Sequence, residues 1–241
     1  MKMKSILLLV AVTIFSSTIV FAQRSDETYL KADEIPNGVY WLPTPPAPGS
    51  SQFMADIAQY FWGKQQRLDT LRAQKAIREA AYEVKDMAVL FSKVFGMEIS
   101  PEKTPKIHKL LNRSIPTIRL CATKPKNTYL RKRPFVYFNE STLIPAEEEE
   151  LRKTGSYPSG HTIKGWGMAL LLSEINPAAQ DEIFKLGYEW GQSRVIAGYH
   201  WQSDVDASRM LAAACVARLH SNKDFLNDMK DAREEFEKLK K

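Results

Sequence analysis

The chain has 241 residues, of which 44% are hydrophobic and 26% are charged. These proportions are typical of one folded globular domain, and they exclude a chain that is disordered throughout. The formal net charge of +6 is too small a bias to indicate, by itself, a protein that binds nucleic acid, so no nucleic-acid partner is expected.

Residues 1–22 are predicted to be a cleaved secretory signal. Lys2 and Lys4 precede the apolar run 6–20, and small or aliphatic residues follow where a signal peptidase cuts. Cleavage leaves a chain from Gln23 with 32 basic and 28 acidic residues, a net charge of +4, in the periplasm or outside the cell. The alternative is an uncleaved anchor, although the run is shorter than the ~20 residues of a typical span. No later stretch is apolar enough for stable membrane insertion.

Residues 23–51 contain four prolines near their end, which predicts an extended N-terminal arm lying on the domain. From there, apolar residues recur at spacings of three and four, and this pattern predicts helices over 52–96. The next helix is expected to open at Thr104 and to run to residue 118, with a kink or break at Pro116.

Residues 135–157 form the longest connection without a helical pattern, and they contain the acidic run from Glu147 to Glu150. A loop of this length inside a compact domain is usually functional or mobile. Two interpretations of the acidic run stay open at this point. It is either a solvated charged surface or a lid that repels wrongly charged substrates.

Three helices are predicted over 162–175, 179–198 and 203–220, and a surface helix packed by one narrow edge over 222–241. The first is apolar nearly all round, so we expect it to lie at the centre of the molecule. No strand pattern of comparable strength is present. The predicted fold class is therefore all-α, with a single compact helical domain over 52–241 and a central buried helix.

The stretch 155–162 reads Gly-Ser-Tyr-Pro-Ser-Gly-His-Thr and directly precedes the central helix. Pro158 fixes the backbone and Gly160 permits close approach, at a helix start whose unpaired N–H groups attract an anion. A serine hydroxyl and a glycine amide can contact phosphate oxygens, while His161 can exchange a proton near neutral pH. The stretch therefore predicts anion binding together with acid chemistry.

Arg194 falls on the same helical stripe as Trp190, which directs a guanidinium toward the buried side, where it needs an anion. That anion is either a ligand or an internal carboxylate. His200 and Asp204 are four residues apart and share one face if the segment is helical, so Asp204 can accept a hydrogen bond from the imidazole. Such a histidine is a base, a nucleophile, a metal ligand or a structural residue, and Asp204 can instead cap a helix.

Lys126 and Arg133 are seven residues apart, two turns along one face if the segment is helical, although neighbouring basic residues favour a solvated surface when the pair is taken alone. Together, however, Lys-x6-Arg-Pro, Pro-Ser-Gly-His and Ser-Arg-x5-His-x3-Asp resemble the signature of the type 2 phosphatidic acid phosphatase and vanadium haloperoxidase superfamily. The stretch 155–162 resembles the longer signature of the class A bacterial non-specific acid phosphatases. The resemblance covers roughly residues 126–220.

The resemblance implies that His200 is the nucleophile that takes the phosphoryl group as a phosphohistidine, oriented by Asp204. It implies that His161 protonates the departing alkoxide. The groups implied to hold the phosphate oxygens come from three segments of the chain: Lys126, Arg133, Ser159, Gly160 through its N–H, and Arg194. This agrees with the physics, because phosphoryl transfer needs in-line placement and cationic stabilisation of the equatorial oxygens.

The function implied is a secreted, metal-independent acid phosphatase that hydrolyses small phosphomonoesters, with inorganic phosphate or vanadate as inhibitors. The family also implies homo-oligomers. One alternative is a vanadate-dependent haloperoxidase, whose pocket uses the same residue types. Another is a secreted protein that binds phosphate without turning it over. A membrane lipid phosphatase is disfavoured because the mature chain has no predicted transmembrane helix.

Cys121 and Cys215 lie in apolar helical contexts, and they are expected either to pair in an oxidising compartment or to remain buried free thiols. There is no CxxC and no Cys/His cluster, so no metal or other cofactor is expected. The aromatic residues beside the motifs either border the substrate mouth or pack in the core, and these are Tyr157, Tyr199 and Trp201.

Overall fold

The computed structural model of the chain describes residues 28–240, so the predicted signal over 1–22 lies outside the described residues. All regular structure within 28–240 is helical, which confirms the all-α prediction. The α-helices are α1 (Ser51–Gln66), α2 (Thr70–Arg78), α3 (Val84–Phe95), α4 (Pro105–Arg119), α5 (Thr123–Tyr129), α6 (Pro134–Phe138), α7 (Glu148–Arg152), α8 (Gly160–Ile175), α9 (Gln180–Ile196), α10 (Gln202–Leu219) and α11 (Lys223–Leu239). Short 3₁₀ helices are η1 (Gly38–Tyr40), η2 (Leu120–Ala122), η3 (Pro145–Glu147) and η4 (Pro177–Ala179).

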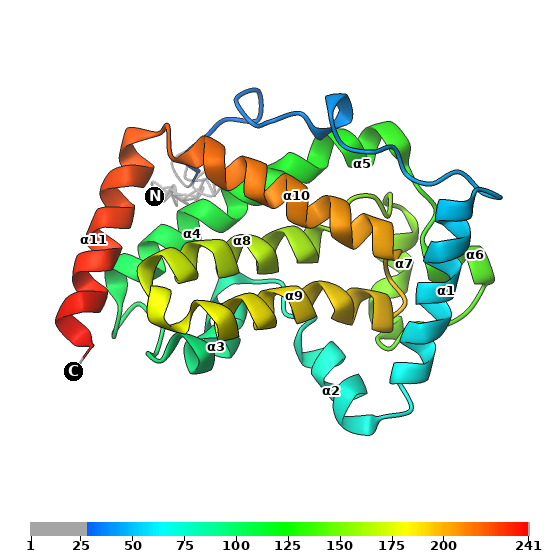
Figure 1. The fold of residues 1–241 in the computed structure, drawn as a ribbon, viewed down its shortest axis with the longest axis horizontal. Helices are drawn as coiled ribbons and strands as arrows, with labels where there is room; N and C mark the ends of the chain where they lie inside the picture. Colours follow the sequence, from blue (N-terminus) through cyan, green and yellow to red (C-terminus); the bar gives the residue numbers. More distant parts are fainter. Residues whose placement is uncertain (1–27, 241) are drawn as a thin grey trace, which may run out of the picture.

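Helix α8 is the centre of the bundle. It packs against α9, α10 and α4, and Figure 1 shows it lying between α10 and α9. Its buried residues come from every side of the helix, as expected for a helix without a solvent-facing stripe. The prediction of a central buried helix is therefore confirmed, with α11 across one end of the bundle and α1 across the other.

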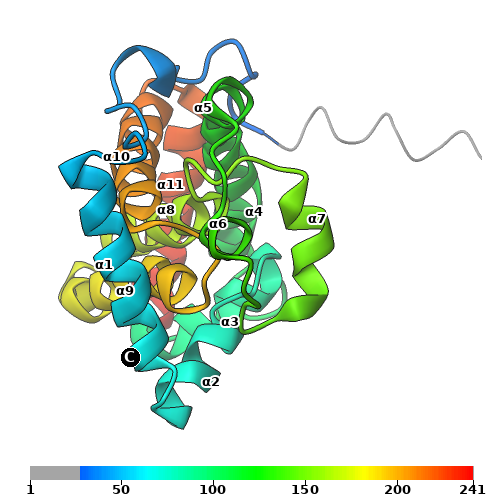
Figure 2. The same cartoon turned by 90° about the vertical axis from the view of Figure 1, so that its right-hand side faces the viewer.

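The chain direction brings three helix ends together. Helices α8 and α10 begin, and α9 ends, at the end of the bundle that faces the viewer in Figure 2. The short helices α6 and α7 lie at the same end, and Figure 2 shows α6 between α1 on one side and α7 on the other. Segments that are far apart in the sequence therefore meet where the predicted site residues are found.

Residues 28–50 run over α10 and α5 without an α-helix, before α1 begins at Ser51 (Figure 1). Buried side chains and hydrogen bonds hold this arm in place. Leu30 and Leu42 are buried, and the Tyr29 hydroxyl donates to Asp228 at 2.7 Å. Nearer the site, the Tyr157 hydroxyl donates to the Pro43 carbonyl at 2.6 Å, so the proline segment is fixed beside the signature stretch.

Two local predictions need correction. Helix α4 is continuous from Pro105 to Arg119, so Pro116 lies inside a helix, and of the predicted kink or break the break does not occur. The connection 135–157 is not without helices, because α6, η3 and α7 lie within or across it. The acidic run Glu147 to Glu150 falls at the end of η3 and the start of α7, where carboxylates favourably face the positive end of the helix dipole.

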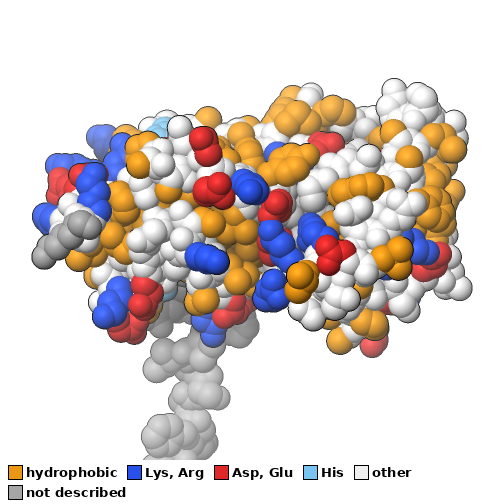
Figure 3. Space-filling model, turned by 60° about the horizontal axis from the view of Figure 1, so that its bottom comes forward, with side chains coloured by type: hydrophobic (Ala, Val, Ile, Leu, Met, Phe, Trp, Pro, Cys, Tyr) orange, Lys and Arg blue, Asp and Glu red, His pale blue; other side chains and the backbone are white. Residues whose placement is uncertain are grey.

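The surface agrees with a small net charge. On the face that Figure 3 shows, basic and acidic side chains are interspersed, and hydrophobic side chains lie among them. Helix α11 buries one edge through Phe225, Met229 and Phe236, as predicted for a surface helix. Among the helices of residues 28–240, none has both the length and the apolar character needed to cross a membrane.

Candidate active site

The predicted site residues come from four segments that meet at one end of the bundle. Asp204 lies in the first turn of α10, Arg194 in the last turn of α9, and His161 in the first turn of α8. The fourth segment runs from Lys126 on α5 to Arg133 before α6. Hydrogen bonds and shared electrostatic effects, described next, connect these segments directly.

His200 lies just before α10, not inside it, so the condition under which His200 and Asp204 would share a helix face is not met. The imidazole nevertheless reaches the carboxylate, with Nδ1 at 3.4 Å from Asp204 Oδ2 and at 3.3 Å from Ser156 Oγ. Asp204 Oδ2 also accepts the Trp201 backbone N–H at 2.9 Å. Asp204 therefore caps α10 and orients His200 at the same time, because one carboxylate oxygen can accept more than one hydrogen bond.

The protonation of His200 follows from the neighbours of its two ring nitrogens. Its Nε2 lies 3.1 Å from Arg133 Nη1, an N–H donor, so Nε2 is an acceptor and the ring proton sits on Nδ1, toward Asp204. The imidazole is buried, and its pKa is lowered by this burial and by the charges of Arg133, Lys126 and Arg194. His200 is thus held neutral with a free lone pair, which is the state a nucleophile requires.

Arg133 and Lys126 meet on one backbone carbonyl. Lys126 Nζ donates to the Gly155 carbonyl at 2.6 Å, and Arg133 Nη2 donates to the same oxygen at 3.3 Å. The segment between them is not one helix, because α5 ends at Tyr129, Leu130 after it has φ of 42°, and the chain is extended at Arg133. Arg133 is buried, so the interpretation of the pair as a solvated basic surface does not hold for it. Burial is the main cause that lowers the pKa of Lys126, and it lowers the pKa of Arg133 to about 10.

Arg194 is fully buried and lacks hydrogen-bond partners. Its side chain is 0% exposed, and none of its three guanidinium nitrogens makes a hydrogen bond within the described part of the chain. Within residues 28–240, its one salt bridge is a long one, from Nη2 to Glu147 Oε2 at 3.6 Å, and the centroid of the Tyr199 ring lies 4.3 Å from the guanidinium carbon. A buried guanidinium left in this state is costly unless an anion binds to it.

The first turn of α8 supplies backbone donors. Ser159 is the N-cap, and its hydroxyl accepts the Thr162 N–H at 3.3 Å and the Thr162 hydroxyl at 2.9 Å. The Ser159 N–H donates to Ser208 Oγ at 2.7 Å, which ties the start of α8 to α10. The N–H groups of the first turn, including that of Gly160, have no partner inside the helix and suit an anion.

His161 is half-buried beside this helix start. Its Nε2 lies 3.1 Å from the Ala80 carbonyl, an acceptor, so Nε2 carries a proton and Nδ1 is the nitrogen that gains or loses the second one. Its pKa is lowered by burial first and then by the charges of Arg194 and His200. The charge of His200 is among the causes of this shift, so the His161 imidazole lies within the electrostatic range of His200.

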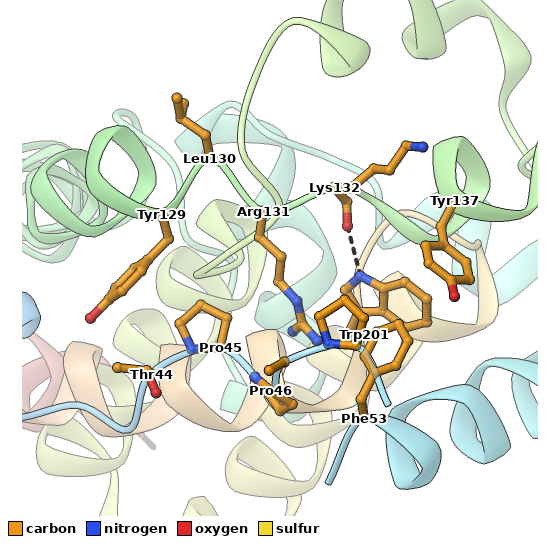
Figure 4. A pocket seen from close by; sticks show the side chains of 12 residues that line it. Thr44, Pro45, Pro46, Phe53, Tyr129, Leu130, Arg131, Lys132, Tyr137 and Trp201 are labelled. Carbon is orange, nitrogen blue, oxygen red and sulfur yellow. Dashed lines mark hydrogen bonds between the residues drawn. The ribbon is translucent and has the colours of Figure 1, made fainter. Parts of the chain in front are cut away.

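Sequence reasoning missed Arg131, which binds the second oxygen of the Asp204 carboxylate. Arg131 Nη1 donates to Asp204 Oδ1 at 2.6 Å, and Arg131 Nη2 donates to Asp56 Oδ2 at 2.7 Å. Figure 4 shows its side chain reaching from the segment after Leu130 toward the Trp201 indole. Asp56 lies 75 residues away in the sequence, so no local pattern could have found the pair.

Ser156 was also missed as an individual residue, although it lies inside the signature stretch. Its hydroxyl donates to Asp204 Oδ2, and it is fully buried. The carboxylate of Asp204 is therefore surrounded by Ser156, Arg131, the Trp201 backbone and His200. Such a set of hydrogen bonds fixes the carboxylate, and with it the direction of the imidazole.

The remaining predictions near the site are decided by burial. Tyr157, Tyr199 and Trp201 are all at most 1% exposed, so they pack in the core, and Trp201 also lines the pocket that Figure 4 shows. Cys121 and Cys215 are both buried free cysteines, which agrees with the second of the two alternatives for them.

The site combines a neutral, oriented imidazole, a second imidazole, the half-buried cation of Lys126, and the buried cations of Arg133 and Arg194, of which Arg194 lacks a hydrogen-bond partner among the described residues. This set can bind a tetrahedral dianion, transfer its central atom to nitrogen and protonate a departing oxygen.

A family pattern and individual relatives both match this chain, and they agree with each other. The sequence pattern of the PAP2 superfamily matches residues 114–227. A protein of Providencia stuartii named non-specific acid phosphatase is 44% identical, over 99% of this chain and 100% of its own length. Proteins with the same name from Salmonella typhimurium (strain LT2) and Salmonella typhi are 40% and 41% identical, over 92% and 84% of this chain and 90% and 81% of their own lengths.

Proposed function

The chain belongs to the non-specific acid phosphatases of the PAP2 superfamily, and from that membership we propose that it hydrolyses phosphomonoesters through a phosphohistidine at His200. The observation that carries the proposal is the fully buried guanidinium of Arg194 without a hydrogen-bond partner. It lies one turn from His200, whose backbone N–H points to the Arg194 carbonyl at 3.4 Å. A phosphoryl group bound there would satisfy the cation and face the nucleophile.

In the first step, the Nε2 lone pair of His200 attacks phosphorus, and the bond from phosphorus to the leaving oxygen breaks. His161 gives the proton on Nδ1 to that oxygen, which departs as an alcohol. The attack makes the His200 ring cationic, and Asp204 stabilises the charge through Nδ1–H. Arg133 must shift its N–H from Nε2 to a phosphate oxygen as the substrate binds.

In the second step, a water molecule attacks the phosphohistidine. His161, now neutral, takes a proton from that water, and the phosphorus–nitrogen bond breaks. Inorganic phosphate leaves, and both imidazoles return to their starting states. Vanadate, which adopts the geometry of the transition state, is expected to inhibit, and phosphate to compete as product.

The charge for this chemistry comes from protein side chains. Lys126, Arg133 and Arg194 would surround the equatorial oxygens, where negative charge is spread in the transition state. We propose on this ground that the reaction needs no metal ion. Activity that survives dialysis against EDTA would support this, and restoration by added Mg²⁺ or Zn²⁺ after EDTA treatment would contradict it.

We also propose export from the cytoplasm, on the basis of residues 1–22. N-terminal sequencing of the protein from a periplasmic fraction is expected to start at Gln23.

The intermediate is tested by rapid mixing with a ³²P-labelled aryl phosphate, followed by denaturation at alkaline pH, where phosphorus–nitrogen bonds persist. Label is expected on His200 within one turnover. Label on another residue, or a full burst of product without any labelled protein, would reject the mechanism. Assays with hydrogen peroxide and halide, with and without vanadate, separate this enzyme from a haloperoxidase, for which vanadate is essential instead of inhibitory.

A further inference from the structure

Arg119 is a further cation near the start of α8, and it is not part of the signature. It is the last residue of α4, and its guanidinium lies against the start of α8. A Cβ atom placed on Gly160 would lie 2.7 Å from Arg119 Nε and 3.2 Å from Arg119 Nη2. The Arg119 guanidinium is therefore directly beside Gly160, whose N–H is proposed to bind a phosphate oxygen.

The electrostatic effects place Arg119 in the same field as the other cations. The pKa values of Lys126 and Arg133 are lowered mainly by burial, and the charge of Arg119 contributes to both shifts. Within residues 28–240, Arg119 forms no salt bridge, and its one hydrogen bond goes from Nε to the Tyr82 hydroxyl at 3.0 Å. Four cations gathered in this way repel one another unless anions separate them.

Tyr82 contacts both Arg119 and His161, and this places Arg119 on the side of the site where His161 lies. The Tyr82 ring lies 4.8 Å from the His161 ring and is 39% exposed, so it connects the imidazole to solvent. Lys164 Nζ lies 3.6 Å from the centroid of the Tyr82 ring and helps to hold the ring in place. Under the proposed function, His161 protonates the leaving oxygen, so the leaving group extends past Tyr82 and Arg119.

We propose that Arg119 binds a second anionic group on the leaving group, and that the enzyme favours phosphomonoesters that carry a second phosphate a few bonds from the one transferred. This rests on the proposed roles of His200 and His161. The terminal nitrogens Nη1 and Nη2 are available for two hydrogen bonds to such a phosphate, a geometry for which a guanidinium is suited. A substrate with a neutral leaving group has nothing to place there.

The test compares two substrates that differ only in the second phosphate: propyl phosphate and propane-1,3-diol bisphosphate. The wild type is expected to have the higher kcat/KM on the bisphosphate. Arg119→Met is expected to lower kcat/KM on the bisphosphate roughly ten- to a hundredfold, the range for a charge-assisted hydrogen bond, and to change propyl phosphate by less than about twofold. Arg119→Lys should retain part of the preference.

A matched control separates contact from general attraction. Lys124→Met removes an exposed cation from the neighbouring helix α5, and it should change both substrates little and equally. Equal losses on both substrates in Arg119→Met would mean that Arg119 contacts the transferred phosphoryl group, and no loss would mean a structural role. Either result overturns the proposal.

A binding measurement tests the role of Arg119 independently of the phosphohistidine mechanism. Calorimetric titration of the His200→Ala variant, with and without Arg119→Met, gives the affinity for both compounds without turnover. The second substitution should weaken only the bisphosphate. If His200→Ala retains normal hydrolysis, the phosphohistidine mechanism fails, while the affinity difference still decides the role of Arg119.

Discussion

Two buried arginines at the same site are in opposite states. Arg131 is bonded to two carboxylates, Asp56 and Asp204, and to the Ser203 hydroxyl. Arg194 is even more buried, yet its three guanidinium nitrogens have no hydrogen-bond partner within the described residues. Both cations are removed from water, so the difference lies in what the protein supplies to each.

The difference separates framework from binding surface. A satisfied buried ion pair fixes its partners, and here it fixes the carboxylate that orients His200. An unsatisfied guanidinium stores interaction energy for a ligand that brings its own negative charge. Removing the first should damage stability and geometry together, whereas removing the second should damage binding and rate alone.

The largest effect is expected from the nucleophile itself. His200→Ala removes the atom that forms the covalent intermediate, and kcat should fall by about 10⁴- to 10⁶-fold. Phosphate binding should be retained, because the three cations remain. Steady-state kinetics together with phosphate titration measure both quantities, and a wild type inactive on several phosphomonoesters would instead favour a protein that only binds phosphate.

The next largest effect is expected at the unsatisfied arginine. Arg194→Met should lower kcat/KM by about 10²- to 10³-fold, the size seen when one donor to a transition-state oxyanion is lost. Its melting temperature without phosphate should be equal or higher, because a buried charge without hydrogen bonds, paired only at 3.6 Å with Glu147 among the described residues, is removed. Phosphate should stabilise the wild type and no longer stabilise the variant. A strongly destabilised Arg194→Met would contradict the contrast with Arg131.

Arg131→Met should show the reverse pattern. The substitution leaves Asp56 and Asp204 as unpaired buried carboxylates, which costs about 3–5 kcal/mol of stability, while kcat/KM should fall only ~10- to 100-fold. Loss of the positive charge beside Asp204 also favours the protonated form of His200, so the acid limb of kcat/KM should move to higher pH. Arg131→Lys keeps the charge and should leave that limb in place. A loss of stability without any change in the pH profile would reduce Arg131 to a purely structural residue.

The smallest effect concerns pH in the wild type. The mechanism needs His200 neutral and His161 protonated, and burial lowers the pKa of both imidazoles, so both groups titrate on the acid side of the ordinary histidine range. The kcat/KM profile should therefore be bell-shaped with an acidic optimum. A bound phosphate dianion raises the pKa of His161, so the basic limb of kcat should lie at higher pH than that of kcat/KM. A rate that rises steadily from pH 5 to 9 would contradict the assignment.

The same pKa shifts affect stability, with a sign that can be checked. Both imidazoles bind protons less readily in the folded state than when unfolded, so the unfolded chain takes up more protons as pH falls below about 6.5. Stability is therefore lost as pH decreases through this window, and bound phosphate should offset the loss.

Local patterns predicted most of the helices and all of the signature residues that meet at the site. Apolar spacing identified α8 as central, and it identified the buried side of α9 that carries Arg194. What failed was geometry that depends on where a helix ends. Leu130 in the left-handed region ends α5 before Arg133, and His200 precedes α10 instead of lying on it.

Contacts between distant segments could not be predicted in the same way. The pairing of Asp56 with Arg131 depends on how α1 crosses the end of the bundle, which no short spacing encodes. The position of Glu147 near Arg194 likewise arises from the path of η3. Arg119 occurs in no motif, and only its place against Gly160 identifies it.

The most direct test is a crystal structure of the enzyme with bound vanadate. We predict that vanadium is bonded to His200 Nε2, that the nitrogens of Arg194 donate to its equatorial oxygens with those of Arg133 and Lys126, and that His161 faces the opposite apical oxygen. Vanadate bound elsewhere, or bound at His200 while the Arg194 guanidinium still has no partner, would contradict the central claim that this buried cation is reserved for the transferred group.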